Sequence, residues 1–318
     1  MLLGIDIGAT KVALAVADDA GQIVARSRRP TGSTRRPADD VARITEAARA
    51  LIAEVGTRAG ALHAVGISVP GPLDARTGTV LRPPNLPSWD AVPLRAWVEE
   101  ALEAPVRLEN DANAAALAEW RFGAGRGVDD MLLLTMSTGV GAGLILGGRL
   151  HAGHFGTAGE VGHVPVEWGG EPCLCGLHGC LEAYTGGAAW TLRLRAITPA
   201  DSRVCALAGG QDGITPEHLV AAAREGDAFA VGEMERWNEY LARAIVNLTM
   251  LLAPQVVVLG TIARAAGERL CLGPVRKRVA QQVWSHQAPT LRIVAAELGD
   301  ELPYRAGIGV AMQGLAPA

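Results

Sequence analysis

The chain has 318 residues, of which 49 % are hydrophobic and 19 % charged, and its formal net charge is −4. This length predicts two packed lobes, and the charge gives no reason to expect a nucleic-acid partner. No basic region precedes a long apolar stretch at the start, and polar residues and glycines interrupt the longest apolar segment, 131–146. The sequence therefore predicts a cytoplasmic protein without a membrane partner.

Short apolar runs separated by turns predict strands in the first part of the chain. The expected strands are 4–7, 12–17, 22–26 and 65–69. A helix is predicted over 39–53, because apolar residues recur there on one face. The arginine-rich segment 26–36 is short and rich in Pro and Gly, and it is interpreted as a solvated loop.

The remainder of the chain alternates predicted strands and helices. The expected strands are 106–108, 131–137, 142–146 and 255–259, and the expected helices are 112–120, 227–252 and 304–315. Residues 1–16 and 131–146 both read as strand, glycine turn and strand. One such hairpin in each of two lobes would explain the repetition, although common hairpin patterns explain it too.

Two glycine-containing turns are candidate phosphate sites. The first, Gly8-Ala9-Thr10-Lys11, follows a strand that ends near Asp6, and consecutive backbone N–H groups in such a turn can bind an anion. Asp6 is suited to hold Mg²⁺, directly or through water. The second turn contains Thr138, Gly139 and Gly141, and its glycines allow close approach to a polyphosphate. Each turn taken alone is equally compatible with an ordinary hairpin.

The triplet Glu109-Asn110-Asp111 stands between a strand and a helix N-terminus. Asn or Asp at this position can simply cap the helix. The functional interpretation makes Asp111 the group that orients an alcohol and accepts its proton during phosphoryl transfer. Asn110 could then bind sugar hydroxyls as donor and acceptor.

A cysteine cluster predicts a structural metal site. Three of the five cysteines, Cys173, Cys175 and Cys180, lie within eight residues, and His163 precedes them. Three thiolates and one imidazole form a closed tetrahedral zinc set. His178 inside the cluster competes for the fourth position; His163 is preferred because Glu160 lies beside it and Glu182 follows Cys180. The alternative for these two glutamates is solvated surface acid.

Taken together, these residues resemble the ROK family of repressors and sugar kinases over nearly the whole chain. The motifs that carry the resemblance are Asp6 to Lys11, Pro84-Asn85-Leu86-Pro87, 109–113, 138–141, 159–163 and 173–182. The resemblance implies an α/β, two-lobed ATPase fold like that of actin and hexokinase, with the active site in the cleft between the lobes. We expect a small lobe of 1–109 and 303–318 with the first phosphate turn and part of the sugar site. The large lobe, 110–302, would hold the second turn, the zinc loop and the adenosine side.

The resemblance also assigns roles to individual residues. Asp111 becomes the catalytic base, and His163 with the three clustered cysteines becomes the zinc set. The implied sugar ligands are Asn85, Asn110, Asp111, Glu160, His163 and Glu182. The implied nucleotide-side residues are Asp6, Gly8, Thr10, Lys11, Thr138, Gly139, Gly141 and Gly260. The implied cofactors are ATP, Mg²⁺ and structural Zn²⁺, and the implied assembly is a homodimer.

Two positions depart from the family pattern and concern the nucleotide. Ala9 stands where the family usually has a second glycine, and Thr261-Ile262 follow Gly260 where a glycine triplet is typical. Either departure could weaken ATP binding or change the phosphoryl donor.

The predicted function is an ATP-dependent sugar kinase, most simply a glucokinase. Kinases for N-acetylglucosamine, N-acetylmannosamine or fructose are alternatives, as is a non-catalytic sugar-binding relative that has lost its nucleotide. A family regulator would carry a DNA-binding segment before the first turn, and Asp6 stands too close to the start for one.

Overall fold

The computed structural model describes residues 1–31, 36–56 and 60–313, and the chain forms two compact units. The first unit comprises Met1–Arg126, Ala152–Gly156 and Leu298–Ala318, and the second comprises Gly127–His151 and Thr157–Glu297. Among the described residues, no helix is both long enough and apolar enough to span a bilayer.

The units divide after helix α3 (Asp111–Phe122), whereas the expected limits, 1–109 and 110–302, divide the chain before it. α3 packs on the C-terminal helix α11 (Leu302–Ala311) and on strands of the first sheet, and these contacts place it in the first unit. The helix expected over 304–315 is thus α11; residues 314–318 of the expected small lobe lie outside the described residues. The expected cleft between the lobes stays a prediction.

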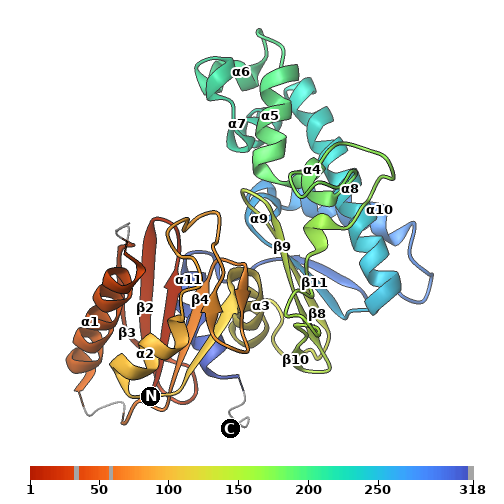
Figure 1. Ribbon diagram of the computed structural model, residues 1–318. Coiled ribbons are helices and arrows are strands. Elements are labelled where there is room, and N and C mark those ends of the chain that lie inside the picture. Colours follow the sequence, from red (N-terminus) through yellow and green to blue (C-terminus); the bar gives the residue numbers. More distant parts are fainter. Residues whose placement is uncertain (32–35, 57–59, 314–318) are drawn as a thin grey trace. The chain divides into compact units, whose positions relative to one another are not determined.

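The first unit is built on a five-stranded mixed sheet with the order β3-β2-β1-β4-β7 (Figure 1). Its strands are β1 (Leu2–Ile7), β2 (Lys11–Ala17), β3 (Ile23–Pro30), β4 (Ala64–Val69) and β7 (Val106–Asn110). A separate ribbon is formed by β5 (Leu73–Asp74) and β6 (Thr79–Val80). Strands β1, β4 and β7 are parallel, so their carboxyl ends meet at one edge of the sheet.

Helices cover both faces of this sheet, which explains why β4 is buried along its whole length. α1 (Pro37–Val55) and α2 (Leu94–Leu102) pack with the side chains of Leu3, Ile5 and Ile7. α3 and α11 lie on the opposite face, where Leu2 packs with Ile308. A short 3₁₀ turn (Gly299–Glu301) leads into α11. Asp6 alternates with Ile5 and Ile7 along β1 and therefore faces the α3 and α11 side.

The packing of α11 on the sheet depends on glycines. A Cβ atom added at Gly66 in β4 would lie 2.1 Å from the Gly307 carbonyl oxygen and 2.2 Å from the Ala311 nitrogen. Both contacts are with backbone, so rotation of a side chain cannot relieve them. The absence of a side chain at residue 66 is what allows α11 to approach.

We expect Gly66→Ala to lower the free energy of unfolding by about 3 kcal/mol, because the helix must move away from the strand. Gly232, in helix α8 (Ala228–Leu252) of the second unit, is a matched control, since a Cβ there would meet nothing within 4 Å. Gly232→Ala should instead stabilise the protein by up to about 1 kcal/mol. Chemical denaturation of both variants measures the difference; equal stability of the two would contradict the close packing of α11.

Strand β3 corrects the interpretation of 26–36 as a loop. The strand continues to Pro30 and forms the edge of the first sheet, so Arg26, Arg28 and Arg29 project from an ordered strand. Residues 32–35 lie outside the described residues. Arg28, Arg29 and Pro30 at the end of this edge strand are all exposed, so the segment has no buried apolar run there, which is why the sequence pattern was misleading.

The second unit contains a five-stranded sheet with the order β10-β9-β8-β11-β12. Its strands are β8 (Met131–Met136), β9 (Val140–Leu146), β10 (Arg149–Leu150), β11 (Val256–Leu259) and β12 (Arg292–Ala295). Its α-helices are α4 (Leu181–Thr185), α5 (Gly187–Ile197), α6 (Arg203–Ala208), α7 (Pro216–Glu225), α8 (Ala228–Leu252), α9 (Thr261–Gly267) and α10 (Gly273–Ala280). Shorter turns are Val161–His163, Gln211–Gly213 and the π-helical Glu268–Leu272. At the positions of the sequence repetition, each unit thus has an antiparallel hairpin, β1-β2 in the first and β8-β9 in the second.

Candidate active site and metal centre

The first glycine turn closes the β1-β2 hairpin and is braced from β3. The Gly8 N–H donates to the Lys11 carbonyl at 2.9 Å, and Thr10 and Lys11 are exposed. The hydroxyl of buried Thr31 donates to the Gly8 carbonyl at 2.6 Å, and its N–H donates to the Thr10 carbonyl at 3.0 Å. Thr31 was not predicted, because its role depends on the pairing of β3 with β2. Ala9 is exposed in this turn.

Asp6 stands near the carboxyl end of β1, directly across from Ser68 in β4. The Ser68 hydroxyl donates to Asp6 Oδ1 at 2.6 Å. Desolvation raises the pKa of Asp6 to about 6; the Ser68 hydrogen bond opposes this shift, and the nearby Asp111 carboxylate adds to it. Asp6 is therefore mostly ionised at neutral pH and electrostatically coupled to Asp111.

Asp111 is the first residue of α3, immediately after β7 ends. Its Oδ1 accepts from the Ala112 N–H at 2.9 Å. Although the side chain is accessible, the surrounding protein removes water from the carboxyl group and raises its pKa. An accessible carboxylate with a raised pKa has the properties of a general base.

Asn110 is the N-cap of α3, as expected if the triplet 109–111 serves to cap this helix. Its Oδ1 accepts from the Asn113 N–H at 2.7 Å, so the side-chain NH₂ group is the part left for a ligand. Buried Glu109 accepts from Asn113 Nδ2 at 3.1 Å, and burial raises the pKa of Glu109. Asn85 is exposed in a turn in which the Leu86 N–H donates to the Pro83 carbonyl at 2.9 Å.

The second glycine turn, in the other unit, is held by Glu182. Glu182 Oε2 accepts from the Val140 N–H at 2.8 Å, and a Cβ at Gly139 would lie 2.4 Å from the same oxygen. The start of α5 completes the support, since the Gly187 N–H donates to the Ser137 carbonyl at 2.7 Å. Glu182 therefore braces the turn through one carboxylate oxygen, an arrangement that sequence spacing could not indicate.

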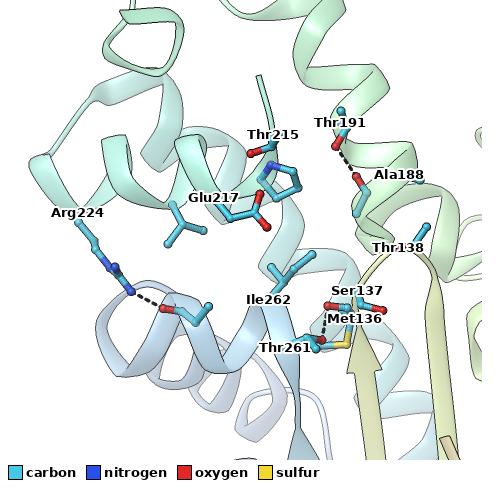
Figure 2. A pocket seen from close by; sticks show the side chains of 14 residues that line it. Met136, Ser137, Thr138, Ala188, Thr191, Thr215, Glu217, Arg224, Thr261 and Ile262 are labelled. Atoms are coloured by element: carbon cyan, nitrogen blue, oxygen red, sulfur yellow. Dashed lines mark hydrogen bonds between the residues drawn. The ribbon is translucent and has the colours of Figure 1, made fainter. Parts of the chain in front are cut away.

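A cavity of about 700 Å³ opens beside this turn, entirely within the second unit. Its wall includes Ser137 and Thr138 of the turn, and residues of α5, α7 and α9 surround the rest. Figure 2 shows Glu217 of α7 and Ile262 of α9 both pointing into the cavity. The lining combines apolar side chains with several hydroxyl groups, one carboxylate and one guanidinium, and its size suits a nucleoside.

Thr261 takes the conformation that a glycine would normally supply. Its φ is +41°, in the left-handed region, which is costly for a β-branched residue. Its hydroxyl turns back to donate to the Met136 carbonyl (Figure 2). The same hydroxyl lies 3.4 Å from the Thr135 hydroxyl. The side chain thus joins β8 to the start of α9 at the wall of the cavity. Gly260 caps α9 beside it.

The metal-ligand candidates converge at one point of the second unit. One ligand atom from each of His163, Cys173, Cys175 and Cys180 lies within 4.8 Å of the others. Cys173 Sγ is 3.7 Å from His163 Nδ1, and the Sγ atoms of Cys175 and Cys180 are 3.7 Å apart. Tetrahedral Zn–S bonds of about 2.3 Å place two sulfurs about 3.8 Å apart, so the donor set and its spacing fit zinc. His178 is exposed and is not part of this group.

Two residues predicted to bind sugar, Glu160 and Glu182, lie close in sequence to the metal-ligand candidates. His163 ends a 3₁₀ turn that begins after exposed Glu160, and its Nδ1 faces Cys173, which leaves Nε2 for another partner. Burial raises the pKa of Cys180 to about 12, so a cation is needed to hold this sulfur as a thiolate at neutral pH. Cys180 immediately precedes α4, which carries Glu182. Only one residue of the chain therefore separates a metal-ligand candidate from the carboxylate that holds the second glycine turn.

The predicted site residues thus form two groups. The first unit brings together Asp6, the first turn, Asn110 and Asp111. The second unit brings together the second turn, Glu182, the cavity and the metal-ligand group. Lining residues from α5 and α7 were missed, because those segments have no motif and reach the cavity only through folding of the second unit.

Comparison with known proteins agrees with these motifs. Residues 2–312 match the ROK family. The glucokinase of Thermotoga maritima is 37 % identical over 302 residues, which cover 94 % of this chain and 93 % of that protein. The crystal structure of a ROK family glucokinase from Streptomyces griseus in complex with glucose and AMPPNP superimposes with a TM-score of 0.77 at 35 % identity, covering 98 % and 99 % of the two chains. A ROK hexokinase from Thermus thermophilus gives a TM-score of 0.81 at 34 % identity, with 98 % coverage of each.

Proposed function

Because this chain belongs to the ROK family, we infer that it is an ATP-dependent glucose kinase. The observation that carries this proposal is the juxtaposition of Asp6, near the carboxyl end of β1, and Asp111, directly after β7, at the edge where these strands and the intervening β4 end. One carboxylate can accept a proton from an alcohol while the other binds the metal that accompanies ATP. The similarity to glucokinases over nearly the whole chain identifies glucose as the alcohol.

In the proposed reaction a sugar hydroxyl attacks the γ-phosphorus of ATP. The new bond joins the sugar oxygen to phosphorus, the bond from phosphorus to the β-γ bridging oxygen breaks, and ADP leaves. Asp111 accepts the hydroxyl proton, and the Asn110 NH₂ group orients the sugar. The raised pKa of Asp111 makes its carboxylate a better acceptor at neutral pH than an ordinary aspartate.

The cavity beside Ser137 and Thr138 is the proposed site of the adenosine part of ATP. It joins the second glycine turn directly, so one molecule can place its nucleoside in the cavity and its phosphates at the turn. Thr261 does not crowd this space, because its hydroxyl is bonded to the Met136 carbonyl. This arrangement supports ATP as the donor despite the missing glycine triplet.

Mg²⁺ and Zn²⁺ complete the proposal with different roles. Asp6 offers the hard oxygen ligand that Mg²⁺ prefers, and Mg²⁺ would neutralise charge on the phosphates. His163, Cys173, Cys175 and Cys180 would hold Zn²⁺ as a structural ion. With Nδ1 directed to the metal, His163 Nε2, together with Glu160, would be fixed for sugar binding. The remaining Glu182 oxygen and Asn85 are the other proposed sugar ligands.

We expect the protein to act in the cytoplasm as a homodimer. Its cysteines are free, and a reducing compartment with ATP keeps three of them available for metal. The dimer rests on the family resemblance, and light scattering in solution tests it.

A coupled ADP-release assay with a panel of sugars tests the function. We expect the highest kcat/KM with glucose and lower values with mannose, fructose and the two N-acetylhexosamines. ADP release with an N-acetylhexosamine but not with glucose would retain the kinase and reject glucose. If no sugar stimulates ADP release and calorimetry detects sugar but not Mg-ATP binding, the chain is a sugar-binding protein without catalysis.

A further inference from the structure

A row of side chains crosses the first sheet at the level of Asp6. Backbone pairing aligns Arg28 of β3 with Ala13 of β2, Ala13 with Asp6 of β1, and Asp6 with Ser68 of β4. Directly paired residues project from the same face of a sheet. The hydrogen bond from Ser68 to Asp6 agrees with this arrangement. Arg28 therefore projects on the Asp6 side, two strands away.

The residue between Arg28 and Asp6 is small. Ala13 is buried, at 3 % exposure, and carries only a methyl group, so it places no long side chain between Arg28 and Asp6. Neighbouring strands are about 4.8 Å apart, so β3 and β1 are separated by about 10 Å, most of which an extended arginine can cover. The guanidinium of Arg28 interacts electrostatically with Asp6 and lowers the pKa of that carboxyl.

The other two arginines of β3 have different surroundings from Arg28. Arg26 forms an ion pair with Glu301 at 2.5 Å and stacks on Tyr304, which ties it to the start of α11. Arg29 is paired with Val12, whose side chain belongs to the opposite face of the sheet. Within the described part of the chain, Arg28 makes no ion pair or hydrogen bond. It is exposed, and its charge is available to a ligand.

The charge balance of this region requires cations. Asp6 and Asp111 are close enough for the charge of one to raise the pKa of the other. A transferred phosphoryl group carries its charge on three equatorial oxygens and would be repelled by both carboxylates. In the proposed function Mg²⁺ supplies part of the compensation. The exposed Lys11 of the first glycine turn carries a further positive charge. A planar guanidinium on the same face of the sheet as Asp6 is suited to bind two of the phosphoryl oxygens at once.

We propose that Arg28 is a further catalytic residue, whose guanidinium binds the equatorial oxygens of the phosphoryl group during its transfer from ATP to the sugar. The inference rests on the proposed kinase function. Arg28 forms no covalent bond and moves no proton; it stabilises charge that is spread over the group in the transition state. The contribution should therefore affect kcat much more than the KM for sugar.

The test compares Arg28→Ala and Arg28→Lys with Arg29→Ala, in which the same residue type is removed from the opposite face. We expect Arg28→Ala to lower kcat ~10²–10³-fold, as loss of one preorganised charge-stabilising group does elsewhere. Arg28→Lys should recover part of the loss, because the charge remains but the planar fork is absent. Arg29→Ala should keep the kcat of the parent protein, and all three should keep its melting temperature.

Rescue by a small cation provides the decisive readout. Millimolar guanidinium should raise the kcat of Arg28→Ala and leave that of Arg29→Ala unchanged, because only the first variant has lost a guanidinium at the reacting group. An Arg28→Ala enzyme with the parent kcat would overturn the inference while leaving the kinase intact. A loss of activity that guanidinium does not restore would also overturn it. If the parent protein phosphorylates no sugar, the proposed function itself is wrong, which the sugar panel shows separately.

Discussion

Asp111→Asn is expected to reduce kcat for sugar phosphorylation by ~10²–10⁴-fold, because the amide cannot accept the hydroxyl proton. The amide keeps the size of the side chain and can still accept from the Ala112 N–H, so α3 should begin at the same residue. Steady-state kinetics with glucose and Mg-ATP measure the loss. Calorimetry should still detect sugar binding, since the Asn110 NH₂ group and the other sugar ligands remain.

The control for this variant is Asp39→Asn, which removes an exposed carboxylate from the first turn of α1. It loses the same charge at a comparable helix position and should keep the parent kcat. Unchanged turnover in Asp111→Asn would remove the proposed base. Loss of sugar binding along with turnover would instead identify Asp111 as a binding group with no separate role in proton transfer.

The sequence predicts Asp111 as a candidate base because its signal is local. A carboxylate between a buried strand and a helix can be recognised from a few residues, and strand pairing then determines what stands beside it. The same holds for the metal-ligand candidates, whose cysteines are adjacent in the chain. Helix α8 was predicted to within one residue because its apolar residues recur regularly over 25 positions.

Other parts of the site depend on contacts between distant segments and had no local signal. Thr31 braces the first turn through the pairing of β3 with β2, and Arg28 approaches Asp6 through the same pairing. Glu182 was predicted as a sugar ligand, but its bond to the Val140 N–H joins residues 42 positions apart. The left-handed conformation of Thr261 is likewise invisible in sequence, where threonine predicts an extended backbone.

The metal centre and the second glycine turn are connected through a short stretch of chain. Cys180 immediately precedes α4, and Glu182 in the first turn of that helix accepts from the Val140 N–H. The metal-ligand group also contacts the backbone of the 3₁₀ turn that ends at His163, since Cys180 Sγ lies 3.4 Å from the His163 carbonyl oxygen. A change in metal occupancy should therefore reach both the proposed sugar ligands and the proposed phosphate turn.

Removal of zinc is expected to unfold the segment 159–182 locally and to abolish most sugar phosphorylation. Structural zinc contributes about 10–16 kcal/mol of binding free energy in small zinc domains. Without the ion, no comparable interaction holds the three thiols and the imidazole in one place. Elemental analysis should find one zinc per chain. Hydrogen exchange should accelerate across this segment after chelation, and added Zn²⁺ should restore both protection and activity.

Cys180→Ser should reproduce the effect of chelation, whereas Cys205→Ser, which removes a thiol outside the metal-ligand group, should retain zinc and activity. The Val140 amide distinguishes local loosening from general instability, because loss of its bond to Glu182 should accelerate its exchange, while amides of β1 in the first unit should not change. Protein that contains no zinc after careful purification yet turns over at the full rate would reject the metal centre. Zinc-free protein in which segment 159–182 stays protected would show instead that the loop folds by its own packing.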